Sequence, residues 1–247
     1  MTTPVVPPIL FEDNHVLVAI KPPRLLTQGD STGDGDLLSL LKNYIREKYD
    51  KPGEAFLGLV HRMDRPVGGL LVFARTSKAA ARFAMQLKEG ALNREYVLVC
   101  QGETPDRFVL KDYLVKDPQT NMVSVLPLHL RLQGKEAVLH GQTVAHSEEK
   151  SLVAVKLQTG RAHQIRTQMA HFGHPLLGDA RYNSSGATGL IALWGMRLSF
   201  NHPITGKAMV FICTPDNLPG AFAHSRHFDP YREELDMLTR VWPDIAP

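Results

Sequence analysis

Residues 61–100 read HRMDRPVGGLLVFARTSKAAARFAMQLKEGALNREYVLVC and contain a polar loop followed by two apolar runs with an amphipathic segment between them. The runs at Gly69–Ala74 and Arg94–Cys100 have the length and composition of buried strands. Ser77 is placed to cap a helix between them, and Gly90 is placed to end that helix in the left-handed conformation. This stretch therefore predicts a strand, a helix and a second strand in succession.

Strands and helices continue in both directions from this stretch, in irregular order. Ile9–Ile20 predicts two short strands around a polar turn, and Asp36 is placed to cap a helix from Leu37 to about Tyr49. The remaining expected elements are a strand at 152–157, a helix at 162–172, strands at 195–200 and 208–213, and a terminal helix at about 229–241 with Pro230 at its first position.

This succession lacks the regular βαβαβ order of a doubly wound sheet, so the fold class that we expect is α+β. The expected architecture is a mixed, mostly antiparallel sheet flanked by helices. No repeat or linker-like stretch divides the chain, which favours one domain at residues 9–247 after an N-terminal tail at residues 1–8.

The composition is typical of a soluble globular protein: 43% of the 247 residues are hydrophobic, 21% are charged, and the mean hydropathy is −0.15. No apolar run approaches the length of a bilayer span, and the N-terminus carries no export signal, so we expect a cytoplasmic protein without membrane contact. The two cysteines, Cys100 and Cys213, have no CxxC partner. This argues against a disulfide scaffold or a zinc cage and fits a reducing compartment.

The net charge of +3 is small, but the positive charge is unevenly distributed along the chain. Residues 61–100 carry seven Lys/Arg against three Asp/Glu, and residues 150–182 carry five against one. Two basic segments fit a surface that faces a polyanion, provided that the fold brings them together. They fit ordinary solvated faces as well, so charge alone leaves both interpretations open.

The first polar cluster precedes the strand at 69–74 and places Asp64 between Arg62 and Arg65. Neighbouring arginines favour the ionised carboxylate, and an ionised aspartate on a loop beside a sheet is suited to act as a nucleophile or a general base. The alternative is an ion-pair network that only fixes the loop.

The second polar cluster spans residues 159–174 and reads TGRAHQIRTQMAHFGH. On the expected helix, Arg166 lies at the edge of the core-facing stripe, where an arginine normally needs a carboxylate or phosphate partner. The alternative is an arginine whose stem packs on the protein while its head stays in water.

Metal and nucleotide motifs are weak or missing in this sequence. His171 and His174 span the expected helix end, and no Asp or Glu lies between His163 and His174. The aspartates at 30, 34 and 36 lack the acidic residue that a calcium loop needs at its twelfth position, where this chain has Leu41. There is also no GxxxxGK[ST], GxGxxG or GxSxG. The sequence signals for a metal or nucleotide site are therefore weak.

Together the two clusters resemble the RluA-type RNA pseudouridine synthases. Residues 61–74, HRMDRPVGGLLVFA, are similar to the family segment HRLDxxTSGLLxxA. Residues 159–182, TGRAHQIRTQMAHFGHPLLGDARY, are similar to TGRxHQIRxHLxxxGHPIxGDxxY. Ordered matches run from about residue 9 to residue 215, and the second segment is long enough to make coincidence negligible. Because eight residues precede the first expected strand, the resemblance is to the form without an N-terminal S4 domain.

The resemblance implies a role for four residues. Asp64 would be the catalytic nucleophile that acts on a flipped-out uridine, and Arg166 would pair with Asp64 to hold it ionised. Tyr96 would stack on the uracil ring, and Arg62 would help push the target base out of its stack and occupy the gap. Whether Asp64 attacks C1′, attacks C6 or removes a sugar proton stays open.

The resemblance also implies the partners of the protein. The substrate would be a structured RNA, a stem-loop of ribosomal or transfer RNA, and the family uses no metal and no cofactor. We expect a monomer. The chain departs from the family segments at Val67–Gly68, which replace Thr-Ser, at Gln168, which replaces a histidine, and at Trp194–Gly195, which replace His-Ala. These departures concern RNA contacts, since Asp64, Arg166 and Tyr96 are all present.

Overall fold

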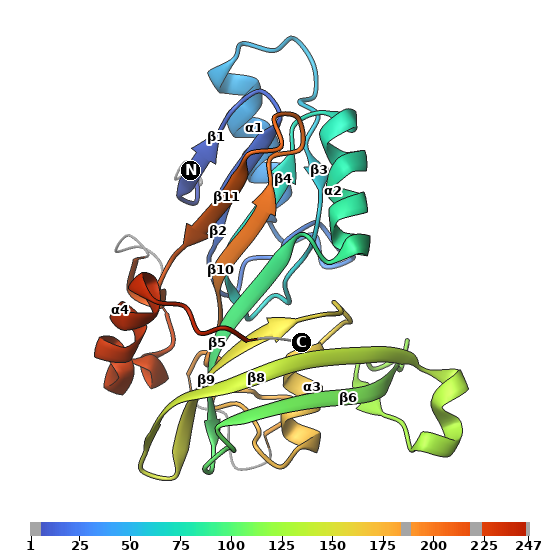
Figure 1. Ribbon diagram of the computed structural model, residues 1–247. Helices are drawn as coiled ribbons and strands as arrows, with labels where there is room; N and C mark the ends of the chain where they lie inside the picture. Colours follow the sequence, from blue (N-terminus) through green and yellow to red (C-terminus); the bar gives the residue numbers. More distant parts are fainter. Residues whose placement is uncertain (1–5, 184–188, 218–223, 246–247) are drawn as a thin grey trace. The chain divides into compact units, whose positions relative to one another are not determined.

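The computed structural model describes residues 6–183, 189–217 and 224–245. The chain divides into two compact units (Figure 1). The first unit holds Met1–Asn93 and Arg197–His224, and the second holds Arg94–Met196 and Ser225–Pro247. Every strand pair with a described register is antiparallel, and helices accompany the strands in both units. The predicted α+β class is therefore confirmed, while the single domain at 9–247 stays a prediction.

The first unit is built on a sheet in the order β1-β2-β4-β10, in which β3 pairs with β4 and β11 pairs with β10. The helix α2 packs against β4 and β3 (Figure 1). The bounds of its elements are β1 Ile9–Glu12, β2 Val16–Lys21, α1 Leu37–Lys48, β3 Gly58–Leu59, β4 Gly68–Ala74, α2 Ser77–Glu89, β10 Leu193–Asn201, β11 Ala208–Ile212 and a 3-10 turn at Pro215–Asn217. Of β10, the residues from Arg197 onward belong to this unit, and Leu193–Met196 belong to the second.

The predicted strands and helices of this unit are present, and their ends follow from named side chains. All residues of β2 and β4 are buried, because both runs are almost entirely apolar. Asp36 caps α1 as predicted, by accepting a hydrogen bond from the Ser39 amide. The predicted cap of α2 is wrong by one residue: the Thr76 hydroxyl accepts from the Ala79 amide, and Ser77 is the first helical residue.

The second unit is built on a sheet in the order β5-β9-β8-β6-β7. Its helix α3 packs against β6 and β7 (Figure 1). The bounds are β5 Asn93–Gln101, β6 Arg107–Lys116, β7 Val123–Val125, η1 Leu128–Gln133, β8 Lys135–Ser147, β9 Lys150–Leu157, α3 Gln164–His171, η3 Arg226–Tyr231 and α4 Arg232–Arg240. The strands β6, β7 and β8 are not among the elements expected from the sequence.

The terminal helix differs from its prediction at its start. Pro230 lies inside the 3-10 helix η3, and the α-helix begins only at Arg232. A proline cannot supply the backbone N–H that a continuing α-helix needs, and the α-helix accordingly begins beyond it. Within the described residues, every helix is too short or too polar to cross a membrane.

Candidate active site

Asp64 lies in the first unit, on the loop that leads into β4, and its side chain is half-buried. Neighbouring residues anchor this loop through Thr27. The Thr27 hydroxyl donates to the Met63 carbonyl at 2.8 Å and accepts from the Met63 amide at 3.2 Å. The Asp64 carbonyl accepts from the Val67 amide at 3.0 Å, which closes the turn. The loop therefore presents Asp64 from a fixed backbone.

The arginines beside Asp64 lie in different surroundings. Arg62 is exposed to solvent. Arg65 pairs with Asp34 at 2.7 Å and also donates to the Arg24 carbonyl at 3.1 Å. The alternative interpretation of this cluster was an ion-pair network that fixes the loop. One such ion pair is present, and it joins Arg65 to Asp34.

Lys21, which the sequence analysis did not single out, ties the end of β2 to the Asp64 loop. Its ammonium is fully buried and donates to the carbonyls of Pro22 at 3.0 Å, Leu25 at 2.7 Å and Arg65 at 3.1 Å. Burial lowers the pKa of Lys21 to about 7, against the opposing attraction of the Asp64 carboxylate. The protonated form has one N–H for each of the three carbonyl oxygens. The sequence signal that could have singled out Lys21 is its position at the end of an otherwise apolar strand.

Arg166 lies in the second unit on α3, and it has the carboxylate partner that its position demands. Its Nε and Nη2 donate to the two oxygens of Asp179 at 2.8 and 2.7 Å. Arg166 is 4% exposed and Asp179 is 1% exposed, so the interpretation with the head in water is wrong. The expected pair of Arg166 with Asp64 joins residues of different units and stays a prediction.

Tyr182 and His163 hold Arg166 from a second side. The guanidinium carbon of Arg166 lies 5.1 Å from the centre of the Tyr182 ring. The Tyr182 hydroxyl is 2.8 Å from His163 Nδ1 and accepts a hydrogen bond from the Val123 amide at 3.0 Å. His163 adopts a left-handed backbone conformation directly before α3. These contacts fix Arg166 in one orientation within its unit.

Tyr96 lies in the middle of β5 opposite Val155 of β9 and is 6% exposed. Its ring is thus held by the sheet. Gln168, at the position of a family histidine, is buried and has its amide nitrogen within hydrogen-bond distance of the Leu110 and Ala137 carbonyls and of an Asp112 carboxylate oxygen. In this chain that position therefore serves packing within the second unit.

The histidines that could suggest a metal have other partners. His163 is engaged with Tyr182, and His174 Nδ1 donates to the Gln101 carbonyl at 2.9 Å. These two rings therefore have separate structural roles.

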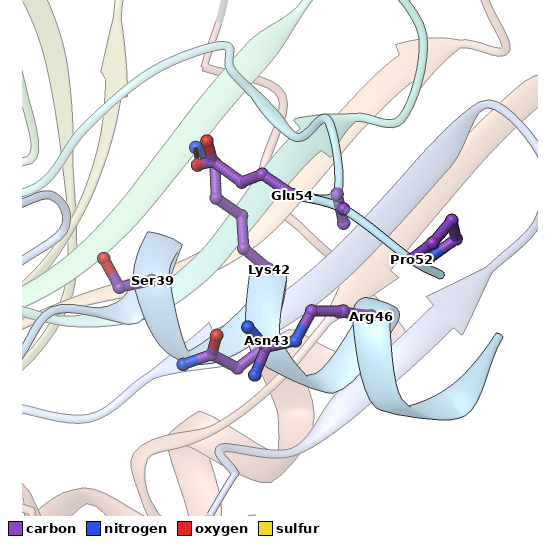
Figure 2. A pocket seen from close by; sticks show the side chains of 8 residues that line it. Ser39, Lys42, Asn43, Arg46, Pro52 and Glu54 are labelled. Carbon is purple, nitrogen blue, oxygen red and sulfur yellow. Dashed lines mark hydrogen bonds and ion pairs between the residues drawn. The ribbon is translucent and has the colours of Figure 1, made fainter. Parts of the chain in front are cut away.

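A pocket of about 310 Å³ lies on the first unit between α1 and the segment that follows it (Figure 2). Figure 2 shows the ends of Lys42 and Glu54 side by side, and their ion pair measures 2.6 Å. None of the predicted site residues lines this pocket. Its lining residues are Ser39, Lys42, Asn43, Arg46, Pro52, Gly53, Glu54 and Ala55.

Comparison with known protein families gives a match over most of the chain. A family model described as RNA pseudouridylate synthase matches residues 15–171. The ribosomal large subunit pseudouridine synthase D of Vibrio vulnificus is 34% identical over 228 residues, which cover 85% of this chain and 68% of the relative. The protein of the same name from Escherichia coli K12 is 30% identical over 250 residues, which cover 93% of this chain and 74% of the relative.

Solved structures show the same fold at lower sequence identity. The human RNA pseudouridylate synthase domain containing 4 superposes with a TM-score of 0.70 at 19% identity, over 89% of this chain and 91% of that one. The human RNA pseudouridylate synthase domain containing 1 gives a TM-score of 0.69 at 20% identity over the whole of both chains. These two likenesses support the α+β fold.

Proposed function

Because the chain belongs to the RNA pseudouridylate synthase family, we propose that it isomerises a uridine of ribosomal RNA, with Asp64 as the nucleophile. The coarser activity, pseudouridine synthesis in RNA, follows from membership of the family. The choice of ribosomal RNA rests on the names of similar bacterial proteins, among them those of Vibrio vulnificus, Zymomonas mobilis and Escherichia coli, which are called ribosomal large subunit pseudouridine synthase D. Transfer RNA, the other substrate expected from the sequence, becomes an outcome of the test.

The reaction needs one carboxylate rather than two. The C1′–N1 bond breaks, the uracil turns, and a C1′–C5 bond forms; N1 gains a proton and C5 loses one. Glycoside hydrolysis normally uses a second carboxyl group to protonate the leaving group. Uracil leaves with its negative charge spread over two carbonyl groups, so a single nucleophile suffices. Water has to be kept away from the sugar intermediate, because water would hydrolyse it.

The observation that carries this proposal is the setting of Asp64 on its anchored loop. The carboxylate is half-buried, its backbone is held through Thr27, and the buried ammonium of Lys21 interacts with it electrostatically. The carboxylate ion is the nucleophilic form of an aspartate side chain. Asp64 is also the acidic residue of the segment that resembles the family's catalytic motif.

The other three predicted residues complete the proposed mechanism. A uridine inside a folded RNA has to be flipped out of its stack, at a cost of roughly a few kcal/mol. We propose that Tyr96 stacks on the flipped uracil and that exposed Arg62 occupies the gap in the RNA. Arg166, held in one orientation by Asp179, acts with Asp64 in catalysis.

Carbodiimide mapping of pseudouridines in total RNA tests the proposal. The samples are source cells, cells without this protein, and deletion cells that express wild type, Asp64→Asn or Asp117→Asn. Asp117 is the matched control, because it is an exposed aspartate whose side chain bonds only within its own turn. We expect one ribosomal site to vanish in the deletion and to return with wild type and Asp117→Asn, but not with Asp64→Asn.

Two other outcomes would overturn parts of the proposal. A lost site in transfer RNA would contradict the ribosomal substrate and leave the reaction standing. No change at any site would contradict catalysis by this chain.

A further inference from the structure

Arg94, at the start of β5 in the second unit, is a partly buried arginine for which the described residues provide no hydrogen-bond or ion-pair partner. Its Nε atom is inaccessible to solvent and makes no hydrogen bond. Across the described residues, 6–183, 189–217 and 224–245, its guanidinium forms no hydrogen bond or ion pair with another side chain or with the backbone. Arg166 of the same unit, by contrast, is paired twice with Asp179.

This unpaired state is unfavourable for the isolated protein. A guanidinium has five N–H donors, and the Nε–H of Arg94 is withdrawn from water without an acceptor, which costs free energy. Burial accordingly lowers the pKa of the Arg94 guanidinium, while electrostatic interaction with Tyr96 opposes that change. Planar guanidinium donors fit the oxygens of carboxylates and phosphates. Arg94 therefore has hydrogen-bond donors that a bound anion could use.

Gly160 provides the space that the Arg94 guanidinium occupies. A Cβ atom at residue 160 would collide with Nη1 of Arg94 and would lie 3.4 Å from its Cζ. Gly160 is the middle residue of Thr159-Gly160-Arg161, the opening of the second polar cluster. The absence of a side chain at this position therefore leaves room for Arg94. The proposed mechanism assigns no other role to Gly160.

Arg94 also has a fixed relation to Tyr96. The two residues are two positions apart on β5, so their side chains leave the same face of the sheet about 6–7 Å apart along the strand. The sugar-phosphate backbone of a nucleotide lies at a similar distance from the centre of its base. A base stacked on Tyr96 would therefore bring a backbone phosphate within reach of Arg94.

We propose that Arg94, seated against Gly160, binds an RNA backbone phosphate next to the target uridine. This inference rests on the proposed function, because it takes Tyr96 as the surface on which the uracil stacks. A phosphate is the expected anion, since every nucleotide of the substrate carries one and no carboxylate of the described residues pairs with Arg94. The contact is made in the bound state as well as in the transition state, so it contributes to affinity more than to the rate of the chemical step.

The test compares Arg94→Met with wild type in binding and in single-turnover rate on a ribosomal RNA fragment that holds the mapped site. Arg232→Met is the matched control, because Arg232 is an exposed arginine of α4 whose ion pair with Asp229 lies at the surface. We expect Arg94→Met to weaken binding and to reduce the slope of log affinity against log salt by about 0.7–0.9, the value for one phosphate contact. At saturating RNA its rate should stay within about threefold of wild type.

A second variant and a measurement of stability separate binding from folding. Gly160→Ala displaces the guanidinium without removing it, and should reproduce the loss of affinity. Arg94→Met should melt at the same temperature as wild type or higher, because it removes a buried Nε–H that has no acceptor. A lower melting temperature with an unchanged salt slope would identify Arg94 as a structural residue and overturn the proposal.

Two further outcomes would also overturn it. An unchanged affinity and salt slope would show that Arg94 touches no phosphate. Unchanged affinity with a large loss of rate at saturation would place Arg94 at the uracil in the transition state instead. Binding is measured independently of turnover, so the salt slope tests Arg94 even if wild type forms no pseudouridine, a result that would count against the proposed function alone.

Discussion

Replacing Asp179 with alanine should lower the free energy of unfolding by about 3–5 kcal/mol, because it leaves the charge of Arg166 buried and uncompensated. This loss of stability lies in the upper part of the range for single substitutions, for reasons that the structure provides. Both side chains are almost fully buried, and two charge-assisted hydrogen bonds at 2.7 and 2.8 Å are lost together. For a chain of this size the melting temperature should fall by about 6–20 °C.

The double variant Arg166→Met with Asp179→Leu is the control for this prediction. It removes both charges and replaces them with apolar side chains of similar size, so its stability should lie close to that of wild type or above it. The comparison separates the cost of an unpaired charge from the cost of disturbed packing.

Unfolding in guanidinium chloride, followed by tryptophan fluorescence, measures both variants. Trp194 is buried in the same unit as the ion pair, so its emission reports on the part of the chain that the substitutions affect. A loss below about 1 kcal/mol for Asp179→Ala would be the value of an exposed ion pair and would refute the reasoning. A double variant as unstable as the single one would refute it too.

Three further predictions concern Lys21, Asp36 and Tyr96. Between pH 7 and the ordinary lysine pKa of 10.5, Lys21 is protonated in the unfolded chain and neutral in the folded protein. The contribution of Lys21 to the free energy of unfolding therefore increases as the pH rises, by at most about 1.4 kcal/mol per pH unit. Urea unfolding at about pH 6 and about pH 9 should therefore show wild type gaining stability relative to Lys21→Met, and a constant difference would contradict the lowered pKa. Asp36→Ala removes the cap of α1 and should cost about 1 kcal/mol, seen as a melting temperature about 2–4 °C lower, whereas Asp106→Ala, at an exposed aspartate, should leave it unchanged. Tyr96→Leu should weaken RNA binding by about 5- to 150-fold through lost stacking, while Tyr96→Phe should retain most of it; equal losses would argue against stacking.

The elements predicted well are those whose signals are local. The strands β2 and β4 follow from unbroken apolar runs, and α1 follows from the Asp36 cap and the helical spacing of its leucines. Even the error at α2 is local, since Thr76 and Ser77 are neighbouring hydroxyl residues and either could cap the helix. The glycine that ends α2, Gly90, adopts the left-handed conformation as predicted.

The strands that were not predicted have weaker patterns. The strand β6 is largely exposed, with only Leu110 and Leu114 buried, so its sequence mixes charged and apolar residues. The strand β8 is buried in its first half only, and its sequence KEAVLHGQTVAHS lacks clean alternation. The strand β6 pairs with β8 across the intervening segment that holds β7 and η1, and no local pattern indicates that pairing. The strand β8 also pairs with β9, which follows it directly in a hairpin.

In the candidate site, too, local features could be predicted from the sequence and long-range contacts could not. The types and spacing of residues around Asp64 and Arg166 single out both segments from the sequence. The partners do not follow from spacing: Arg166 meets Asp179 thirteen residues later, and Lys21 reaches the Arg65 carbonyl forty-four residues later. Such contacts depend on the folded path of the chain. The GD pair within the second family segment was the available signal for Asp179.

Release of tritium from RNA labelled at C5 of uridine measures the proposed chemistry most directly, because C5 loses its hydrogen when it bonds to C1′. Purified wild type and the Asp117→Asn control should release tritium from the ribosomal RNA fragment at the same rate. Asp64→Asn should bind that fragment with near wild-type affinity and release none above background. Release by Asp64→Asn at the wild-type rate would contradict the assignment of Asp64 as the nucleophile.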